Sequence, residues 1–120
     1  MSRVIHFEIT AEDPERAVRF YSRVFGWNIE KWEETTDYWL VSTGKDSPGI
    51  DGAIMPRSEL TGTVNTIEVP SLDSFLGKIL ENGGKVITDP MPIPNVGYFA
   101  YCRDTEGNAF GVMQPDQNAK

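Results

Sequence analysis

The sequence has 120 residues, a formal net charge of −7 and a single cysteine. This length fits one domain, and its 39% hydrophobic and 24% charged residues are typical of a globular protein. One cysteine excludes an intrachain disulfide framework and a thiolate zinc cluster, while the excess of acid disfavours nucleic acid or an anionic membrane as the main partner. Because the sequence contains no long apolar segment and no leader-like N-terminus, we expect a cytoplasmic protein.

The first half of the chain predicts a strand, a helix and three more strands. Residues 3–10 alternate in polarity and are rich in β-branched side chains, as strands are. Asp13 followed by Pro14 is typical of a helix start, apolar residues follow at helical spacing, and Gly26 is a natural stop. Short apolar runs predict the remaining strands at residues 27–33, 37–43 and 50–55.

The second half predicts the same order of elements. After a strand at 62–69, Ser71 caps a helix that stops at Gly83 and Gly84. Residues 116–120 are expected to be frayed. Three further strands are predicted at residues 85–93, 97–103 and 108–114.

The two halves also match in sequence. Residues 7–9 match residues 67–69, and Gly52 matches Gly111. We therefore predict an α+β fold of two βαβββ modules, at about 1–57 and 61–115, within a single domain of residues 1–120. Their sheets would curl around a shared cleft, with each helix on the outer face of its own sheet.

Three segments resemble the vicinal oxygen chelate superfamily, which contains glyoxalase I, extradiol dioxygenases and bleomycin-resistance proteins. HFEITAEDPERAVRFYSRVFGW (6–27) is similar to its first module, and residues 64–84 and 97–114, with DTEGN at 104–108, to its second. The resemblance covers nearly the whole chain and implies the two-module fold. It does not select a reaction, because the superfamily spans lyases, dioxygenases, epimerases and pure binders.

The resemblance also assigns four metal-ligand positions, on the first and last strands of each half. They fall on His6, Gly52, Thr66 and Gly111, and among these His6 alone is a ligand type. A catalytic divalent metal needs about three protein ligands, and iron oxygenases use two histidines, whereas this chain has one histidine. We therefore expect no metal and no cofactor, with His6 as a residual ligand position and the catalytic residues undetermined.

Strand alternation places a polar cluster on the predicted cleft. His6 and Glu8 share one face of their strand, Thr66 and Glu68 share the corresponding face, and the apolar neighbours turn toward the helices. Three interpretations stay open: a satisfied polar network, recognition of a cationic or amine-bearing ligand, and acid–base catalysis or a non-standard metal held by His6, Glu8 and Glu68.

Aromatic residues are concentrated on the middle strands of both halves. Most fit core or dimer packing, and we place Trp39, Tyr98 and Tyr101 in the ligand-binding cleft. Cys102 is interpreted as a small buried hydrophobe, because no base is evident near it.

Together these features favour a metal-independent small-molecule-binding protein of the glyoxalase and bleomycin-resistance kind. The ligand would be cationic or aromatic. The alternatives are a divergent metal-dependent lyase, isomerase or dioxygenase-like enzyme, and a family member that acts mainly through protein contacts. The resemblance further implies a homodimer, either swapped or unswapped.

Overall fold

The chain forms two compact α+β units, and the computed structural model describes residues 2–33 and 37–120. The N-terminal unit comprises Ile5–Val64. The C-terminal unit comprises Asn65–Lys120 together with the first residues of the chain up to Val4. Among the residues described, no helix is long and apolar enough to cross a membrane.

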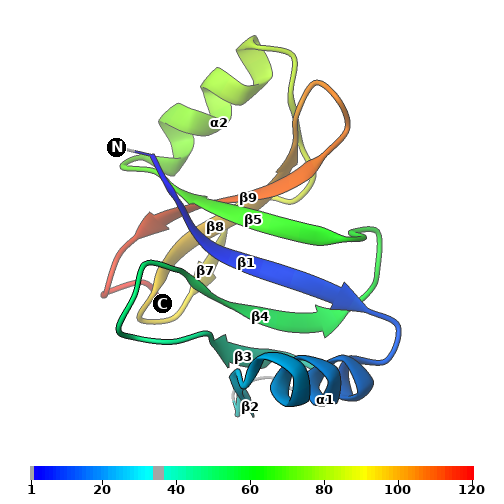
Figure 1. Cartoon of the computed structure of the whole chain (residues 1–120). Helices are drawn as coiled ribbons and strands as arrows, with labels where there is room; N and C mark the ends of the chain where they lie inside the picture. The colour runs from blue at the N-terminus through cyan, green and yellow to red at the C-terminus, as the bar shows by residue number, and fades with distance from the viewer. Residues whose placement is uncertain (1, 34–36) are drawn as a thin grey trace. The chain divides into compact units, whose positions relative to one another are not determined.

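The N-terminal unit contains the predicted strand–helix–three-strand order (Figure 1). Its strands run in the order β2-β3-β4-β1, with β1 parallel to β4 and the other neighbours antiparallel. The elements are β1 (Val4–Ala11), α1 (Pro14–Phe25), β2 (Asn28–Lys31), β3 (Trp39–Ser42) and β4 (Asp51–Pro56).

The C-terminal unit repeats this arrangement. Its first strand again pairs in parallel with its last, and the strand before the last is again antiparallel to it, giving the order β5-β9-β8-β6 with β7 also on β8. The elements are β5 (Thr63–Glu68), α2 (Leu72–Glu81), β6 (Lys85–Val86), β7 (Met91–Ile93), β8 (Gly97–Arg103) and β9 (Ala109–Pro115).

The single strand predicted at 85–93 is wrong, because two short strands, β6 and β7, occupy this segment. The N–H groups of Ile87 and Thr88 both donate to the carbonyl of Tyr101, at 2.8 and 3.3 Å. Two consecutive donors on one acceptor form an irregularity of the bulge type, which interrupts the ladder along β8. Pro90 and Pro92 have no backbone N–H and therefore cannot donate hydrogen bonds to the neighbouring strand.

Both helices begin and end where side-chain and backbone caps dictate. At α1, Asp13 Oδ1 accepts from the N–H of Arg16 at 3.1 Å, and Gly26 adopts a left-handed φ of 72°. At α2, Ser71 Oγ accepts from the N–H of Ser74 at 3.3 Å. The helix ends at Glu81, slightly before the predicted glycines.

Each helix covers one face of the sheet in its own unit, as predicted. In the N-terminal unit, Phe7 and Ile9 of β1 pack with α1 around a core of Ala11, Val41 and Ile54. In the C-terminal unit, α2 covers a core formed by Val69, Leu72, Ala100, Cys102 and Val112. Cys102 is fully buried, which confirms its structural role.

The prediction of a frayed tail is wrong. Ala119 is buried, and its carbonyl accepts from the N–H of Asn95 at 3.0 Å. The N–H of Asp116 donates to the carbonyl of Val96 at 2.9 Å. These backbone hydrogen bonds join the tail to the loop between β7 and β8. The tail is therefore ordered by contacts with a distant segment, which its own composition does not reveal.

Candidate functional site

Three polar side chains of the N-terminal unit are connected on the sheet face turned away from α1. Because Phe7 and Ile9 pack under α1, strand alternation turns His6 and Glu8 to the opposite face. His6 Nε2 lies 3.0 Å from the hydroxyl of Tyr38, which in turn donates to Glu8 Oε2 at 2.5 Å. Glu8 is 5% exposed, so a phenol bridges a buried carboxylate and an imidazole.

The electrostatic environment of His6 keeps its ring neutral. Burial lowers the pKa of His6 below its usual value of 6.5, while the negative charges of Glu8 and Asp51 act in the opposite direction. At neutral pH the ring therefore has one nitrogen with a hydrogen and one with a free electron pair.

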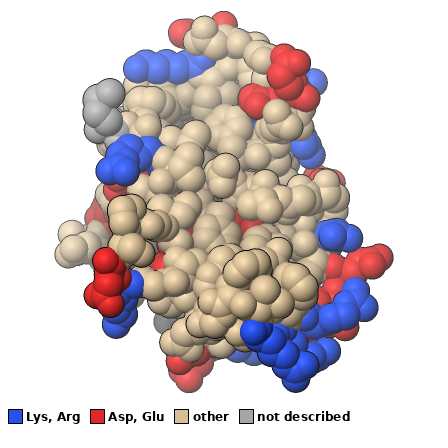
Figure 2. All heavy atoms as spheres, viewed as in Figure 1, with Lys and Arg blue, Asp and Glu red and all other residues tan. Residues whose placement is uncertain are grey.

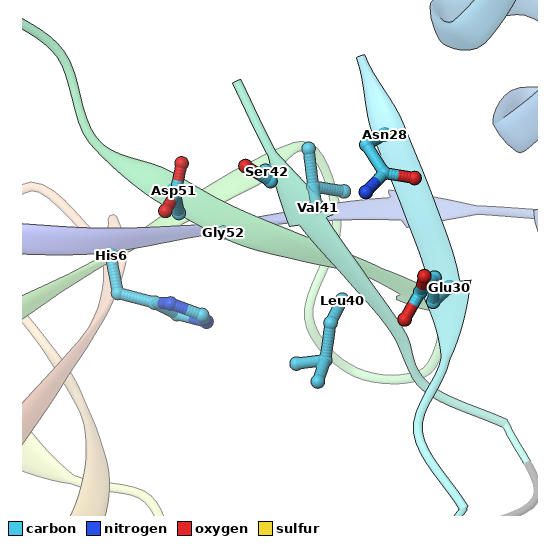
Figure 3. Close-up of a pocket in the computed structure, with 8 residues that line it drawn as sticks. All are labelled: His6, Asn28, Glu30, Leu40, Val41, Ser42, Asp51 and Gly52. Carbon is cyan, nitrogen blue, oxygen red and sulfur yellow. The ribbon is translucent and has the colours of Figure 1, made fainter. Parts of the chain in front are cut away.

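His6 lies beside a concavity of about 310 Å³ that is formed within the N-terminal unit. Figure 3 shows its lining side chains, which come from all four strands β1 to β4. Two carboxylates, Glu30 and Asp51, contribute to this surface, and the described lining includes neither lysine nor arginine. The Asp51 carboxylate is held by Thr43, whose N–H and hydroxyl lie 2.9 and 3.3 Å from Oδ1. The lining residues are His6, Asn28, Glu30, Leu40, Val41, Ser42, Asp51 and Gly52.

The strand register corrects one of the four positions assigned from the resemblance. His6 pairs with Asp51 in the β1–β4 ladder, just as Thr66 pairs with Gly111 in the β5–β9 ladder. Asp51 is therefore the equivalent of Gly111, and Gly52 is displaced by one residue. A Cβ atom on Gly52 would lie 2.6 Å from the ring of Phe7, which belongs to the core beneath α1. Gly52 thus borders the concavity through its backbone, and any side chain here would point toward α1.

In the C-terminal unit, aromatic packing takes the place of this polar chemistry. A Cβ atom on Gly111 would lie 2.6 Å from Cε1 of Phe99 and 3.1 Å from the hydroxyl of Thr66. Thr66 is 2% exposed, and its buried hydroxyl has no hydrogen-bond partner in the described part of the chain. The ring of Phe99 therefore fills the space that a side chain at position 111 would need.

Two of the aromatic residues expected in the cleft lie on the helix-covered faces instead. Trp39 packs against the core beneath α1, and Tyr98 packs against the core beneath α2. The reason is strand alternation, because Trp39 shares its face with Val41, and Tyr98 shares its face with Cys102. Both side chains thus contribute to these cores, and their placement in the ligand-binding cleft stays a prediction.

The remaining predicted site residues belong to the C-terminal unit. Tyr101 contacts Phe99 edge-to-face, with ring centroids 4.6 Å apart, on the face away from α2. Glu68 borders a separate concavity of about 570 Å³ together with Pro70 and Phe75. The shared cleft that would join Thr66, Glu68, Tyr101 and Gly111 to the N-terminal residues stays a prediction.

Sequence reasoning missed Tyr38, Glu30 and Asp51. The pairing register between β1 and β4 identifies Asp51, because Asp51 lies directly opposite His6. Glu30 follows from alternation along β2 once the face of its partner Leu40 is known. No spacing rule could have found Tyr38, which precedes β3 and contacts residues about thirty positions away.

The side chains at the four positions that the resemblance assigns to metal ligands do not form a complete set of metal donors. Across residues 2–33 and 37–120, no group of three or more His, Cys, Asp and Glu side chains is arranged to hold a metal ion. At the register-corrected positions, His6 and Asp51 have ligating side chains, whereas Thr66 and Gly111 supply no strong donor. The expectation that the protein works without a metal stays a prediction.

Comparison with known proteins gives consistent matches. The model of the Glyoxalase/Bleomycin resistance protein/Dioxygenase superfamily matches residues 3–112. A glyoxylase-like domain-containing protein of Didymella fabae is 31% identical over 112 residues, covering 88% of both chains. A putative glyoxylase of Mycobacterium bovis, CFP32, is 30% identical over 114 residues, and the match covers 90% of this chain and 42% of that protein.

Solved structures show the same fold at lower identity. A hypothetical protein from Bacillus halodurans is 15% identical with a TM-score of 0.70, covering 99% of this chain and 98% of that one. A methylmalonyl-CoA epimerase of Streptomyces coelicolor, in complex with 2-nitronate-propionyl-CoA, is 17% identical with a TM-score of 0.65, covering 98% and 97%. The family model, the relatives and the strand topology agree, and the chain belongs to the Glyoxalase/Bleomycin resistance protein/Dioxygenase superfamily.

Proposed function

We propose that this protein binds a small molecule carrying a protonated amine, without a metal, in the concavity of the N-terminal unit. The observation that carries the proposal is the composition of the lining. Glu30, Asp51 and the neutral ring of His6 share one surface to which no described lysine or arginine contributes. Two carboxylates attract a cation, and a neutral imidazole accepts a hydrogen bond from it.

The size and surroundings of the concavity suit a small ligand. Its volume of about 310 Å³ is at the lower end of the range for ligand pockets, about 300–1,000 Å³. Leu40 is 42% exposed and offers apolar surface for the hydrocarbon part of an amine. Figure 2 shows both signs of charge on the face in view, so the proposal depends on local carboxylates and not on the overall charge of −7.

Calorimetric titration tests the proposal directly. The chelator-treated protein is titrated with alkyl and arylalkyl primary amines, and with uncharged alcohols of the same shape. We expect the amines to bind and Asp51→Asn or Glu30→Gln to weaken them by about tenfold, since a hydrogen bond to a charged group contributes about 1.5–3 kcal/mol. Glu81→Gln, at the exposed end of α2, is the matched control. Equal binding of amines and alcohols, or binding of neither, contradicts the proposal.

A divergent metal-dependent enzyme is the second candidate. The observation in its favour is that His6 and Asp51 are ladder partners at two register-equivalent ligand positions. Elemental analysis of protein purified without chelator separates the candidates. Stoichiometric nickel, zinc or iron that disappears in His6→Ala would replace the first proposal with this one. Light scattering in the same samples tests the expected homodimer.

A further inference from the structure

We infer that Tyr38 and Glu8 fix the tautomer of His6 and so present its Nδ1 atom to the concavity as a permanent hydrogen-bond acceptor. The ligand would then be an amine that retains at least one N–H, and quaternary ammonium compounds would be rejected. This inference rests on the proposed function and assigns Tyr38 as a positioning residue.

The tautomer follows from the number of hydrogens on a phenol. Tyr38 has a single hydroxyl hydrogen, and it donates this hydrogen to Glu8 Oε2 at 2.5 Å. The oxygen of Tyr38 is therefore an acceptor toward His6 Nε2, 3.0 Å away. Nε2 must carry the hydrogen of the neutral ring, which leaves Nδ1 with a free electron pair.

The position of Glu8 makes this arrangement stable. Glu8 lies two residues after His6 on the same face of β1, and it is 5% exposed. A buried carboxylate needs a hydrogen-bond donor, and the Tyr38 hydroxyl supplies one. Reversing the tautomer would remove the donor from Nε2 and leave two acceptors, Nε2 and the phenol oxygen, facing each other. Glu8 therefore determines the tautomer of a ring that it reaches through Tyr38.

Nδ1 is available to a ligand. Within the described residues, the ring forms its hydrogen bond through Nε2. Nδ1 is not among the buried atoms that lack a hydrogen-bond partner, which fits an atom accessible from the surface. The ring itself lines the concavity with Glu30 and Asp51. An ammonium N–H can donate to Nδ1 while these carboxylates compensate its charge.

This geometry discriminates among cations. A primary ammonium satisfies the acceptor at Nδ1, whereas a trimethylammonium group of the same charge has no hydrogen to donate. Sites that use a hydrogen bond for recognition reject analogues lacking it, because the protein group is left without a partner. Charge attraction alone would give no such preference.

Nitrogen NMR tests the positioning role on the ligand-free protein. The chain has one histidine, so ¹⁵N-histidine labelling gives one unambiguous pair of ring nitrogens. At pH 7.5 we expect the Nε2–H form alone in the wild type and a mixture of both tautomers in Tyr38→Phe. Tyr98→Phe, in the core of the other unit, is the matched control and should match the wild type. A mixture in the wild type, or an unchanged tautomer in Tyr38→Phe, overturns the positioning role. If Tyr38→Phe does not fold, Glu8→Leu provides the comparison, because it removes the acceptor of the Tyr38 hydroxyl.

Titration with matched ligands tests the selectivity. We expect a primary amine to bind at least about tenfold more tightly than its N,N,N-trimethyl counterpart, and Tyr38→Phe to reduce this ratio toward one. Equal affinity for the two cations contradicts the inference while the proposed function stands. Binding of neither cation overturns the proposed function and the selectivity together, and the NMR result then decides the positioning role alone.

Discussion

Replacing glycine by alanine at three positions should separate backbone-limited sites from adaptable ones. A Cβ on Gly52 would meet the ring of Phe7 at 2.6 Å and also the Phe7 carbonyl oxygen, a backbone atom that no rotamer change can move. At Gly111 the nearest atoms belong to the Phe99 ring, with the Thr66 hydroxyl at 3.1 Å, and all are side-chain atoms. At Gly77, within α2, an added methyl group would have no neighbouring atom of the described chain within 4 Å.

These contacts set the order and size of the expected changes. Overpacking a core costs about 1–3 kcal/mol, so we assign about 3 kcal/mol to Gly52→Ala and about 1 kcal/mol to Gly111→Ala. Gly77→Ala should instead stabilise by about 0.5–1 kcal/mol, because alanine is the better helix former. For 120 residues the unfolding entropy is about 0.25 kcal/mol per kelvin, which converts these energies to losses of about 12 and 4 °C and a gain of about 2–4 °C.

Thermal and urea unfolding, followed by tryptophan fluorescence and circular dichroism, measures all three variants under the same conditions. Gly77→Ala is the control for the substitution itself. The reasoning is refuted if Gly52→Ala melts within about 2 °C of the wild type, or if Gly111→Ala is the less stable of the two, because the β1–β4 register would then be in error.

Three further predictions concern single side chains. Asp13→Ala removes the α1 cap and should lower the unfolding free energy by about 1 kcal/mol in urea denaturation, whereas Asp13→Asn should lower it little; equal losses would contradict a capping role. Burial lowers the pKa of His6, so below pH 6.5 the unfolded chain binds more protons than the folded chain. The free energy of unfolding should therefore fall as the pH drops through 6.5 toward the folded pKa, and it should fall less in His6→Gln. Parallel curves of stability against pH for the two proteins would count against this. Cys102 is fully buried, which raises the pKa of its thiol, so a disulfide reagent such as DTNB should label it only at the rate of unfolding; rapid stoichiometric labelling of native protein would show that the site is open.

Local signals in the sequence predicted the elements that depend on neighbouring residues. Asp13, Gly26 and Ser71 bounded their helices as caps do, and alternation placed Phe7 under α1. The split between β6 and β7 escaped prediction because it depends on the Tyr101 carbonyl accepting from two consecutive N–H groups. The order of the tail also escaped prediction, because it depends on a backbone hydrogen bond between Ala119 and Asn95, which are distant in sequence.

The candidate site was only partly predictable, since it depends on register. Matching the two halves in sequence aligned Gly52 with Gly111, a shift of one residue from the ladder partners His6–Asp51 and Thr66–Gly111. A shift of one residue in a strand exchanges its two faces. Trp39 and Tyr98 pack on the helix-covered faces, and parity within a strand cannot indicate this until the direction of one residue of that strand is known.

The Phe99 ring over Gly111 has a consequence for anyone who would engineer this scaffold. Introducing histidine at position 66 and a carboxylate at position 111 would copy the polar pair of the N-terminal unit onto the matching ladder positions. The new carboxylate would collide with the aromatic ring before it could reach any ligand. A second polar site therefore requires shortening Phe99 first, which makes this residue the starting point of such a design.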